Sequence, residues 1–258
     1  MARIEPILIK LGGSVATFRE RPLAANREAI EGVARSVASC GSPVVLVHGG
    51  GSFGHHYASM YGLGTTSKVI RAEACSKIHN AMLELDLIIT KILVECGVAN
   101  YSLPPVELIA KERVTEYGIT ILKDLIVHRV SPVTFGDVLP SKKGFFILSG
   151  DVIARLVAVA LKARRVFFLL DVDGIFPSRG DSGNVISELD WNTSVQLFRG
   201  KGWDVTGGLA TKIQEAFKIA KAGIDVFFVN GLKPDRVLKA LKGQQIYGTR
   251  IRGVKGGS

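Results

Sequence analysis

Two glycine-rich turns, each following a short apolar segment, contain the residues best suited to chemistry. The first contains Lys10, Gly12 and Gly13, and the second, residues 48–56, contains three consecutive glycines and ends in two histidines. Glycine lets several backbone N–H groups approach one anion, and a following helix adds the positive end of its dipole. Lysine and histidine supply the charge and hydrogen bonds that phosphoryl transfer requires. The two turns therefore predict a phosphate-binding site.

Lys10 lies within an apolar segment, where an unpaired ammonium group is unfavourable. Its anionic partner is either a buried aspartate in a structural ion pair or the phosphate of a ligand. Asp151 stands at a predicted helix start, and Asp171 and Asp173 end the next predicted strand. Taken alone, Asp151 is explained by helix capping and Asp173 by a turn. Their shared place at strand ends favours carboxylates that hold lysines and Mg²⁺.

A third glycine turn, residues 204–208, leads into a predicted helix with Lys212 one turn inside it. This arrangement presents helix N–H groups and an ammonium group to the same anion, although a plain helix start has the same pattern. Among the histidines, His55 at the exit of the second glycine turn is the best candidate for a ligand contact. His48 is expected to pack at a strand end, and no motif surrounds His79.

Two other nucleotide-binding patterns fit the sequence less well. Residues 49–54 satisfy G-x-G-x-x-G, and Glu73 lies about 20 residues on, as in dinucleotide-binding folds. In such a fold this turn normally follows the first strand, whereas here an earlier strand already carries Lys10. The sequence also lacks the loop that ends in Gly-Lys-Ser or Gly-Lys-Thr, because Lys201 is followed by glycine.

The composition bounds the function classes. A chain of 258 residues that is 47% hydrophobic can build one large α/β domain or two lobes that share a sheet. The 33 Lys and Arg outnumber the 23 Asp and Glu, but they are scattered, without an arginine-rich run or interleaved aromatics. This pattern favours an anionic small molecule and disfavours a nucleic-acid partner.

The three cysteines and the lengths of the apolar runs indicate the cellular compartment. Three cysteines without C-x-x-C spacing support neither a disulfide framework nor a zinc site. No signal peptide is recognised, and no apolar run is long enough to cross a bilayer. We expect a cytoplasmic protein with no membrane partner.

Short apolar runs that alternate with helical periodicity predict an α/β fold with an open, mainly parallel sheet. The predicted strands are 7–11, 44–48, 98–103, 118–122, 132–135, 145–149, 166–171 and 226–230. The predicted helices are 23–40, 68–96, 151–163, 209–222 and 234–241. Ligands of such sheets bind beyond the carboxyl ends of the strands, where every motif above falls. A turn near residues 139–144 is the best boundary, dividing the chain into 1–140 and 141–258.

These motifs together resemble the amino acid kinase superfamily and, within it, the isopentenyl phosphate kinases of the archaeal mevalonate route. The resemblance runs almost end to end. It is carried by Lys10-Leu11-Gly12-Gly13-Ser14, His48-Gly49-Gly50-Gly51, Phe53-Gly54-His55, Ser149-Gly150-Asp151, Asp171-Val172-Asp173-Gly174, residues 204–208 with Lys212, and Gly248-Thr249. Most of these motifs are shared superfamily-wide and indicate an ATP-dependent kinase, whereas Phe53-Gly54-His55 is the narrower signal.

The resemblance implies an αβα sandwich with one continuous sheet. It also implies a homodimer, the usual assembly of these kinases. An N-terminal lobe, residues 1–140, would bind the acceptor, a small phosphate monoester, and residues 141–258 would bind ATP with Mg²⁺. The implied catalytic residues are Lys10, His55, Asp151 and Lys212. The implied nucleotide-binding residues are Lys10, Leu11, Gly12, Gly13, Ser14, Gly51, Asp171, Asp173, Gly174, Gly207, Gly208 and Lys212. The implied acceptor-binding residues are Gly50, Gly54, His55 and Gly150, and no side chain is assigned as a metal ligand. The reaction would convert isopentenyl phosphate and ATP to isopentenyl diphosphate and ADP.

The sequence departs from the pattern of this family at three places. Arg19 is the nearest candidate for the basic residue that commonly follows the first glycine turn, and arginine is not equivalent to lysine at a phosphate. Phe135-Gly136-Asp137 stands where His-Gly-Asp is usual, and Leu170 stands where threonine is common.

Two alternatives remain open. One is a kinase of the same superfamily for a nucleoside monophosphate, a carboxylate or a fosfomycin-like phosphonate. His55 argues against a carboxylate acceptor, because carboxylate kinases of this fold lack that histidine, although a fosfomycin-type kinase can share it. The other is a nonenzymatic nucleotide sensor, for which we would expect Lys10 or Lys212 to be replaced.

An apolar stripe on the predicted helix after the second glycine turn is a candidate for the pocket that binds the hydrocarbon tail of the acceptor. Its residues recur at helical spacing: Cys75, Ile78, Met82, Leu85 and Ile89. Most are expected to face the core. The sharper hypothesis is that Ile78 and Met82 close the pocket for the five-carbon chain.

Overall fold

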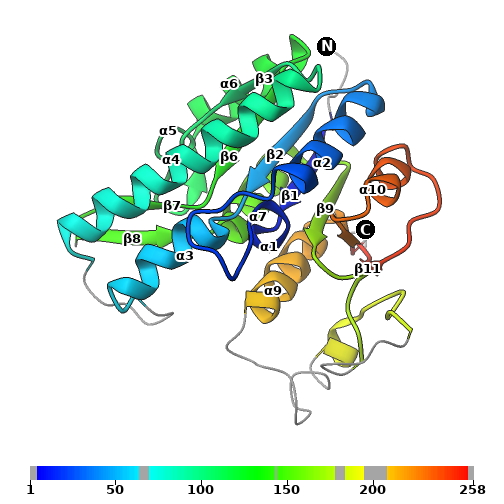
Figure 1. The fold of residues 1–258 in the computed structure, drawn as a ribbon. Coiled ribbons are helices and arrows are strands. Elements are labelled where there is room, and N and C mark those ends of the chain that lie inside the picture. The colour runs from blue at the N-terminus through cyan, green and yellow to red at the C-terminus, as the bar shows by residue number, and fades with distance from the viewer. Residues whose placement is uncertain (1–4, 64–69, 143, 178–183, 195–207, 255–258) are drawn as a thin grey trace.

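A central sheet organises the molecule. The computed structural model describes residues 5–63, 70–142, 144–177, 184–194 and 208–254. Within these ranges, seven strands form one sheet in the order β11-β10-β9-β1-β2-β6-β3 (Figure 1). The strands are β1 (Ile7–Leu11), β2 (Val44–His48), β3 (Asn100–Ser102), β6 (Ser131–Phe135), β9 (Arg165–Leu170), β10 (Asp225–Asn230) and β11 (Thr249–Ile251). Neighbouring strands are parallel, except that β11 runs antiparallel to β10.

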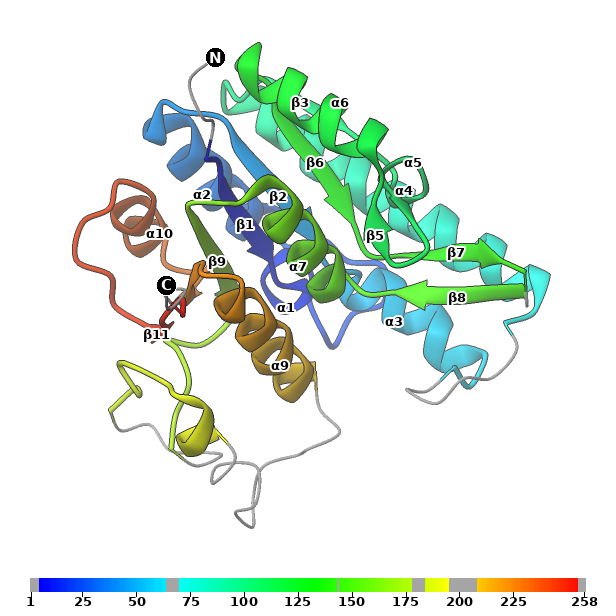
Figure 2. The ribbon, with the colours of Figure 1, turned by 180° about the vertical axis from the view of Figure 1, so that it is seen from behind.

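Helices cover both faces of this sheet. They are α1 (Gly13–Ala16), α2 (Arg27–Cys40), α3 (Gly51–Met60), α4 (Ala72–Glu95), α5 (Pro105–Leu108), α6 (Glu116–Val127), α7 (Gly150–Leu161), α9 (Gly208–Lys221) and α10 (Pro234–Leu241). Figure 1 shows α2, α4 and α10 in front of the sheet, and Figure 2 shows α6, α7 and α9 on the opposite face. Successive strand residues point to opposite faces, so Leu8 joins the core beneath α7 while Ile9 joins the core beneath α2. The predicted α/β sandwich is confirmed.

Strand β1 connects the two parts of the chain. It pairs with β2 on one side, with Leu11 opposite His48, and with β9 on the other, with Leu11 opposite Leu169. Residues from before and after position 140 therefore share one sheet. Among the described residues, no helix is both long enough and apolar enough to span a bilayer.

The strand predicted at residues 118–122 is wrong, because this segment lies within helix α6. Three β-branched residues in a row favoured a strand. However, the side chain of Thr115 caps the helix by accepting a hydrogen bond from the Gly118 amide, and Leu122 and Ile126 are buried one turn apart. An N-cap and an apolar face at helical spacing outweigh a weak β preference.

The segment predicted at residues 145–149 does form a strand, but it does not join the main sheet. β8 (Gly144–Leu148) pairs antiparallel with β7 (Asp137–Ser141) as a separate hairpin, at whose open end Asp137 stands opposite Leu148. Phe146 and Ile147 are 38% and 45% exposed, so this strand is not the buried central strand that its apolar sequence suggested. A second short pair, β4 (Ile109–Ala110) and β5 (Arg113–Val114), also lies outside the sheet.

Candidate active site

A lysine, an aspartate and a second lysine form the centre of the candidate site. Lys10, only 3% exposed in β1, places its Nζ atom 2.6 Å from Oδ1 of Asp151, and Nζ of Lys212 lies 3.3 Å from Oδ2 of the same carboxylate. Asp151 lies in the first turn of α7, whose N-cap is Ser149 rather than Asp151. The structure therefore excludes the alternative that Asp151 serves merely as a helix cap.

The pKa values of this group reflect burial and charge together. Burial lowers the pKa of Lys10, Asp151 raises it, and Lys212 lowers it further. Burial by itself would raise the pKa of Asp151, but the two ammonium groups outweigh this effect and the pKa is lowered below 3.8. Asp151 is therefore ionised near neutral pH and holds two cations at one point.

The first two glycine turns are in direct contact. A Cβ atom on Gly13 would lie 2.5 Å from the amide nitrogen of Gly51, so a side chain does not fit between the turns. Gly51 itself has a φ of +46°, which favours glycine. The Gly12 amide donates a hydrogen bond of 3.1 Å to the carbonyl of Leu169 in β9. The turns after β1 and β2 thus form one continuous surface beside β9.

Thr17, which no sequence motif marked, links these two turns through hydrogen bonds. Its hydroxyl donates to the carbonyl of Gly13 at 2.7 Å and accepts from the amide of Ser52 at 2.8 Å. Thr17 is 1% exposed. Its position four residues after Gly13, within the short helix α1 and its C-cap, is the only local hint of this role.

Gly49 lies against the ammonium group of Lys10, and Gly150 lies against the end of β2. A Cβ atom on Gly49 would lie 3.4 Å from Nζ of Lys10, and one on Gly150 would lie 2.8 Å from the carbonyl oxygen of His48. The start of α7 is therefore pressed against the end of β2. Leu11 and Ser14 flank this surface, Leu11 buried at the end of β1 and Ser14 half-buried in α1.

His55 lies in α3 and borders a cavity of about 440 Å³. The lining residues are Arg19, Pro22, Ser52, His55, His56, Ser59 and Met60. Partial burial lowers the pKa of His55 below 6.5, and Lys212, Lys10 and Arg19 lower it further, opposed by Asp151. A neutral imidazole in this position can donate one hydrogen bond while three cations attract an anion beside it.

Arg19 links the first turn to the end of β9. Its guanidinium lies 3.2 Å from Oδ2 of Asp171 and is 66% exposed. Asp171 follows β9 directly. The structure thus brings Asp171 to the rim of the site through Arg19, one of the three departures from the family pattern.

Asp173 binds side chains other than Lys10 and Lys212, the two lysines at the centre of the site. The Asp173 carboxylate accepts a hydrogen bond of 2.7 Å from Asn230 and forms ion pairs with Lys233 at 3.1 Å and Arg236 at 2.8 Å. Burial by itself would raise the pKa of Asp173, but these three partners outweigh burial and the pKa is lowered. Both carboxylate oxygens already have partners: Oδ1 binds Asn230 of β10 and Arg236 of α10, and Oδ2 binds Lys233, the N-cap residue of α10.

The neighbours of Gly174 explain its residue type. A Cβ atom on Gly174 would lie 2.9 Å from the hydroxyl of Thr249, which accepts the amide of Ile175. In the third glycine turn, Gly207 lies outside the described residues, whereas Gly208 begins α9 and its carbonyl accepts a hydrogen bond of 3.1 Å from Lys212.

Gly50 and Gly54 face an apolar cluster. Cβ atoms on them would lie 3.0 Å and 3.2 Å from the sulfur of Met82. A small core separate from the two main ones contains Met82: Ala58, Ile70, Ala74, Ile78, Met82, Phe135 and Val138. Leu85 and Ile89, further along the same helix stripe, belong to the main core beneath α2 and α4.

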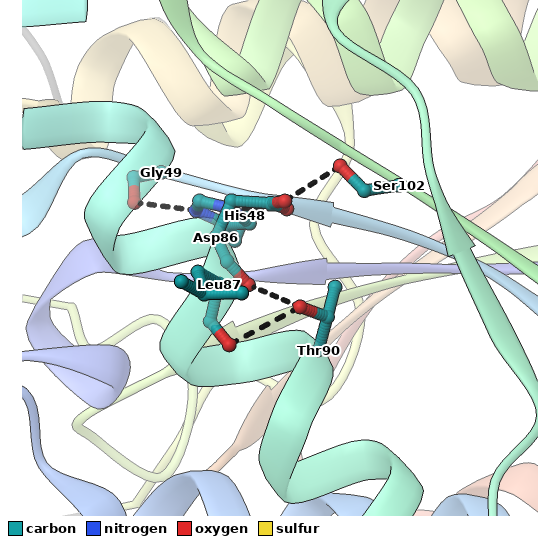
Figure 3. A network of polar contacts seen from close by, with 6 residues as sticks. All are labelled: His48, Gly49, Asp86, Leu87, Thr90 and Ser102. Atoms are coloured by element: carbon teal, nitrogen blue, oxygen red, sulfur yellow. Dashed lines mark hydrogen bonds and ion pairs between the residues drawn. The ribbon is translucent and has the colours of Figure 1, made fainter. Parts of the chain in front are cut away.

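A buried polar network holds the strand end from which the second glycine turn leaves (Figure 3). His48, fully buried, places Nε2 3.2 Å from Oδ1 of Asp86 and Nδ1 3.2 Å from the Gly49 carbonyl. Ser102 donates to Oδ2 of Asp86 at 2.6 Å, and Thr90 donates to the Asp86 carbonyl at 2.8 Å. His48 thus packs at a strand end as expected, but its partner on α4 was not foreseen.

His79 has a partner that no motif marked. Its Nδ1 lies 2.7 Å from Oδ2 of Asp137, whose pKa is raised by burial. Among the described residues, no group of three or more His, Cys, Asp or Glu side chains could hold a metal ion.

The chain resembles known proteins along nearly its whole length. Residues 5–230 match the group described as the Amino acid kinase family. An isopentenyl phosphate kinase of Thermoplasma acidophilum is 31% identical over 95% of this chain and 100% of its own length. One from Methanothermobacter thermautotrophicus is 28% identical over 96% and 99%. A crystal structure of the T. acidophilum isopentenyl phosphate kinase in a product complex superposes with a TM-score of 0.79 at 29% identity, covering 96% of this chain and 100% of that one. The chain therefore belongs to the amino acid kinase family and groups within it with the isopentenyl phosphate kinases.

Proposed function

We propose that this enzyme transfers the γ-phosphoryl group of ATP to isopentenyl phosphate, giving isopentenyl diphosphate and ADP for isoprenoid biosynthesis. The observation that carries the proposal is the convergence of Lys10, Lys212 and His55 on one edge of the sheet. The two ammonium groups share Asp151, and both lower the pKa of His55. Three cationic or hydrogen-bonding groups beside glycine turns match the needs of a reaction between two phosphate groups.

The step needs no general base. A phosphate monoester has a second pKa of about 6, so its oxygen is already a dianionic nucleophile at neutral pH. That oxygen forms a bond to the γ-phosphorus as the bond from this phosphorus to the β–γ bridging oxygen breaks, and ADP leaves with the electron pair. In this proposal Lys10 and Lys212 stabilise the charge on the transferred group, and Asp151 fixes both lysines.

The remaining site residues take roles on either side of this centre. His55, with the backbone of Gly50, Gly54 and Gly150, would bind the acceptor phosphate. The other glycine turns, with Asp171 and Arg19, would bind the nucleotide phosphates. The acceptor would thus lie on residues 1–140 and ATP mainly on residues 141–258. Asp173 would act at one remove, by holding α10 against the end of β9.

Mg²⁺ is expected to arrive with ATP. Magnesium is usually held by substrate phosphates and water with few protein carboxylates, which is compatible with the absence of a metal-binding cluster among the described residues. When bound, the ion would neutralise charge on the β- and γ-phosphates. Asp171, 33% exposed and paired only with Arg19 in the contacts described above, is the carboxylate best placed to bind its hydration shell.

The small apolar core around Met82 is the proposed site for the five-carbon tail. Met82 lies directly against Gly50 and Gly54, the proposed phosphate contacts. A hydrocarbon chain that extends from a phosphate bound there would therefore contact Met82 and Ile78 first. The stripe of α4 divides at this point, because Leu85 and Ile89 belong to another core. This division supports a separate pocket for Ile78 and Met82.

We also propose a cytoplasmic homodimer. The three cysteines are free, as expected in a reducing compartment. Leu83, Leu87 and Val94 lie on one exposed stripe of α4 and are 37%, 53% and 63% exposed, and β3 is an edge strand of the sheet. A second copy seated on this surface would cover both. Light scattering should then give twice the chain mass, and Leu87→Lys should shift it to the monomer.

A coupled assay of ADP release tests the acceptor. Isopentenyl phosphate, UMP, N-acetylglutamate and fosfomycin are compared at equal concentration, with and without Mg²⁺. We expect isopentenyl phosphate to have the highest kcat/KM. Preference for another acceptor would assign the chain a different substrate within the family, and ATP binding without turnover of any of them would favour a sensor.

A further inference from the structure

Two ion pairs join helices α7 and α9, one turn apart and with opposite polarity. In the first, Asp151 of α7 meets Lys212 of α9, with 3.3 Å between Oδ2 and Nζ. In the second, Arg155 of α7 donates from Nε to Oε2 of Glu215 on α9. The helices lie side by side on one face of the sheet (Figure 2) and share one core. The acid is on α7 in the first pair and on α9 in the second.

Glu215 is an unusual residue for a helix interface. It is 4% exposed, and its other oxygen accepts from Lys218 at 2.5 Å. Burial of a carboxylate is unfavourable unless it is paired, and a buried ion pair commonly adds less stability than apolar residues of similar volume. The best-attested benefit of such a pair is a defined register between the elements that it joins.

Register matters here because Lys212 lies near the start of α9. The apolar contacts between α7 and α9, such as those of Ile213 and Ala216 with the shared core, are not directional. A slip of one residue would shift α9 by about 1.5 Å along its axis and rotate it by about 100°. Either change would separate the Lys212 ammonium group from Asp151, and misplacement by about 1 Å can lower a rate by 10²-fold.

We propose that Arg155 and Glu215 are positioning residues for phosphoryl transfer: their ion pair fixes α9 against α7 in the register that keeps Lys212 on Asp151. The inference rests on the proposed function for its kinetic consequence, but its geometric part does not depend on the acceptor. Neither residue needs to touch a substrate. The polarity reversal supports the assignment, because a slip of one turn would bring Lys212 beside Arg155 or Glu215 beside Asp151, and like charges repel.

The kinetic test uses Glu215→Gln, which keeps the size of the side chain and removes its charge. We expect kcat to fall by about 10- to 100-fold while the KM for isopentenyl phosphate stays near the wild-type value, because the acceptor contacts are unchanged. The matched control is Lys218→Ala, which removes a Glu215 partner on the same helix and should leave kcat unchanged.

A double-mutant cycle separates positioning from a merely structural role. If Glu215 acts through Lys212, Glu215→Gln should cause no further loss of kcat in a Lys212→Ala background. Effects that multiply would overturn the proposal, as would a lowered Tm with normal kcat in Glu215→Gln. Should Glu215→Gln not fold, Arg155→Gln replaces it in every arm, since Arg155 is 26% exposed and its loss perturbs the core less.

A crystal structure of the variant, solved without acceptor, gives a readout that is independent of the substrate. We expect Nζ of Lys212 to lie more than about 4 Å from Asp151, beyond ion-pair distance. A separation unchanged from wild type would overturn the proposal even if isopentenyl phosphate is the acceptor. Conversely, a displaced Lys212 would uphold it even if the wild-type enzyme proves to use a different acceptor.

Discussion

Lys10 and Asp151, two residues of opposite charge, meet at 2.6 Å in the interior of the protein, where their side chains are 3% and 9% exposed. Lys212 reaches the same carboxylate from the more open side, with 20% exposure. One aspartate therefore holds one cation fixed within the sheet and another that borders the surface. This difference sets what each substitution should do.

Asp151→Asn should lower kcat far more than it lowers stability. The amide keeps the shape of the side chain but no longer balances the two lysines, so they separate. Asp151 also raises the pKa of Lys10 against the effect of burial, so its removal lowers that pKa further. The alkaline decline of kcat, where Lys10 loses its proton, should therefore begin at lower pH in the variant. Measured pH profiles check this, and a normal kcat in the variant would contradict the assigned role.

His55→Ala should lower kcat/KM for isopentenyl phosphate by about 10²-fold or more, because a donor to the acceptor phosphate is lost. ATP affinity, measured by calorimetry, should change little. The matched control is His56→Ala, since His56 is the adjacent residue in α3 and packs edge-on against Tyr57. Turnover at the wild-type rate by His55→Ala would remove His55 from the site.

The imidazole of His55 should titrate below pH 6.5 in the free enzyme. Partial burial and the charges of Lys212, Lys10 and Arg19 all disfavour its protonated form. A bound acceptor phosphate brings negative charge and should raise this pKa, provided that it sits beside His55. NMR titration of the ring, assigned with His55→Ala, measures both values. An unchanged pKa on saturation with isopentenyl phosphate would place the acceptor elsewhere.

Ile78→Ala or Met82→Ala should lengthen the accepted chain. The new cavity offers contact only to the longer substrate, so kcat/KM for a ten-carbon prenyl monophosphate should rise relative to the five-carbon one. Ile89→Ala is the control, because Ile89 lies on the same stripe but in the main core. If both test variants fold and keep the wild-type ratio, this end of the stripe is core and the tail binds elsewhere.

Asp86→Ala should destabilise the fold by about 1–3 kcal/mol, the usual penalty for leaving a buried polar partner unpaired. His48, fully buried, would lose its carboxylate partner, and Ser102 would lose its acceptor. Urea unfolding measures the effect. Thr90→Ala, which removes only a hydroxyl bonded to a backbone carbonyl, should have the smaller effect. Equal losses in the two variants would show that the His48 contact contributes little.

The sequence predicted the sheet and the central residues well, for a local reason. Strands β1, β2, β9 and β10 are apolar runs bounded by turns. Gly12, Gly49 and Asp171 follow directly after β1, β2 and β9. Because parallel strands end at one edge, residues next to those ends had to be neighbours. The rule does not account for Asp151, because β8, the strand before it, lies outside the main sheet. Asp151 reaches Lys10 because the start of α7 packs against the end of β2.

The sequence did not reveal the contact partners that lie far apart in the chain, because no characteristic spacing relates them. Asp86 lies 38 residues after His48 on a helix whose other residues predict a core face, and nothing local marks it. Arg155 and Glu215 follow Asp151 and Lys212 by one helical turn, so a signal existed. It could be recognised only once α7 and α9 were known to be neighbours.

The pairing of β1 with β9 has a consequence for synthesis on the ribosome. β1 leaves the exit tunnel before the other strands of the sheet, yet its hydrogen-bonding partner at Arg165–Leu170 is made more than half a chain later. Until then one edge of β1 remains open, and an open apolar edge strand readily pairs with other chains. A fragment that ends near residue 140 should therefore aggregate when expressed alone.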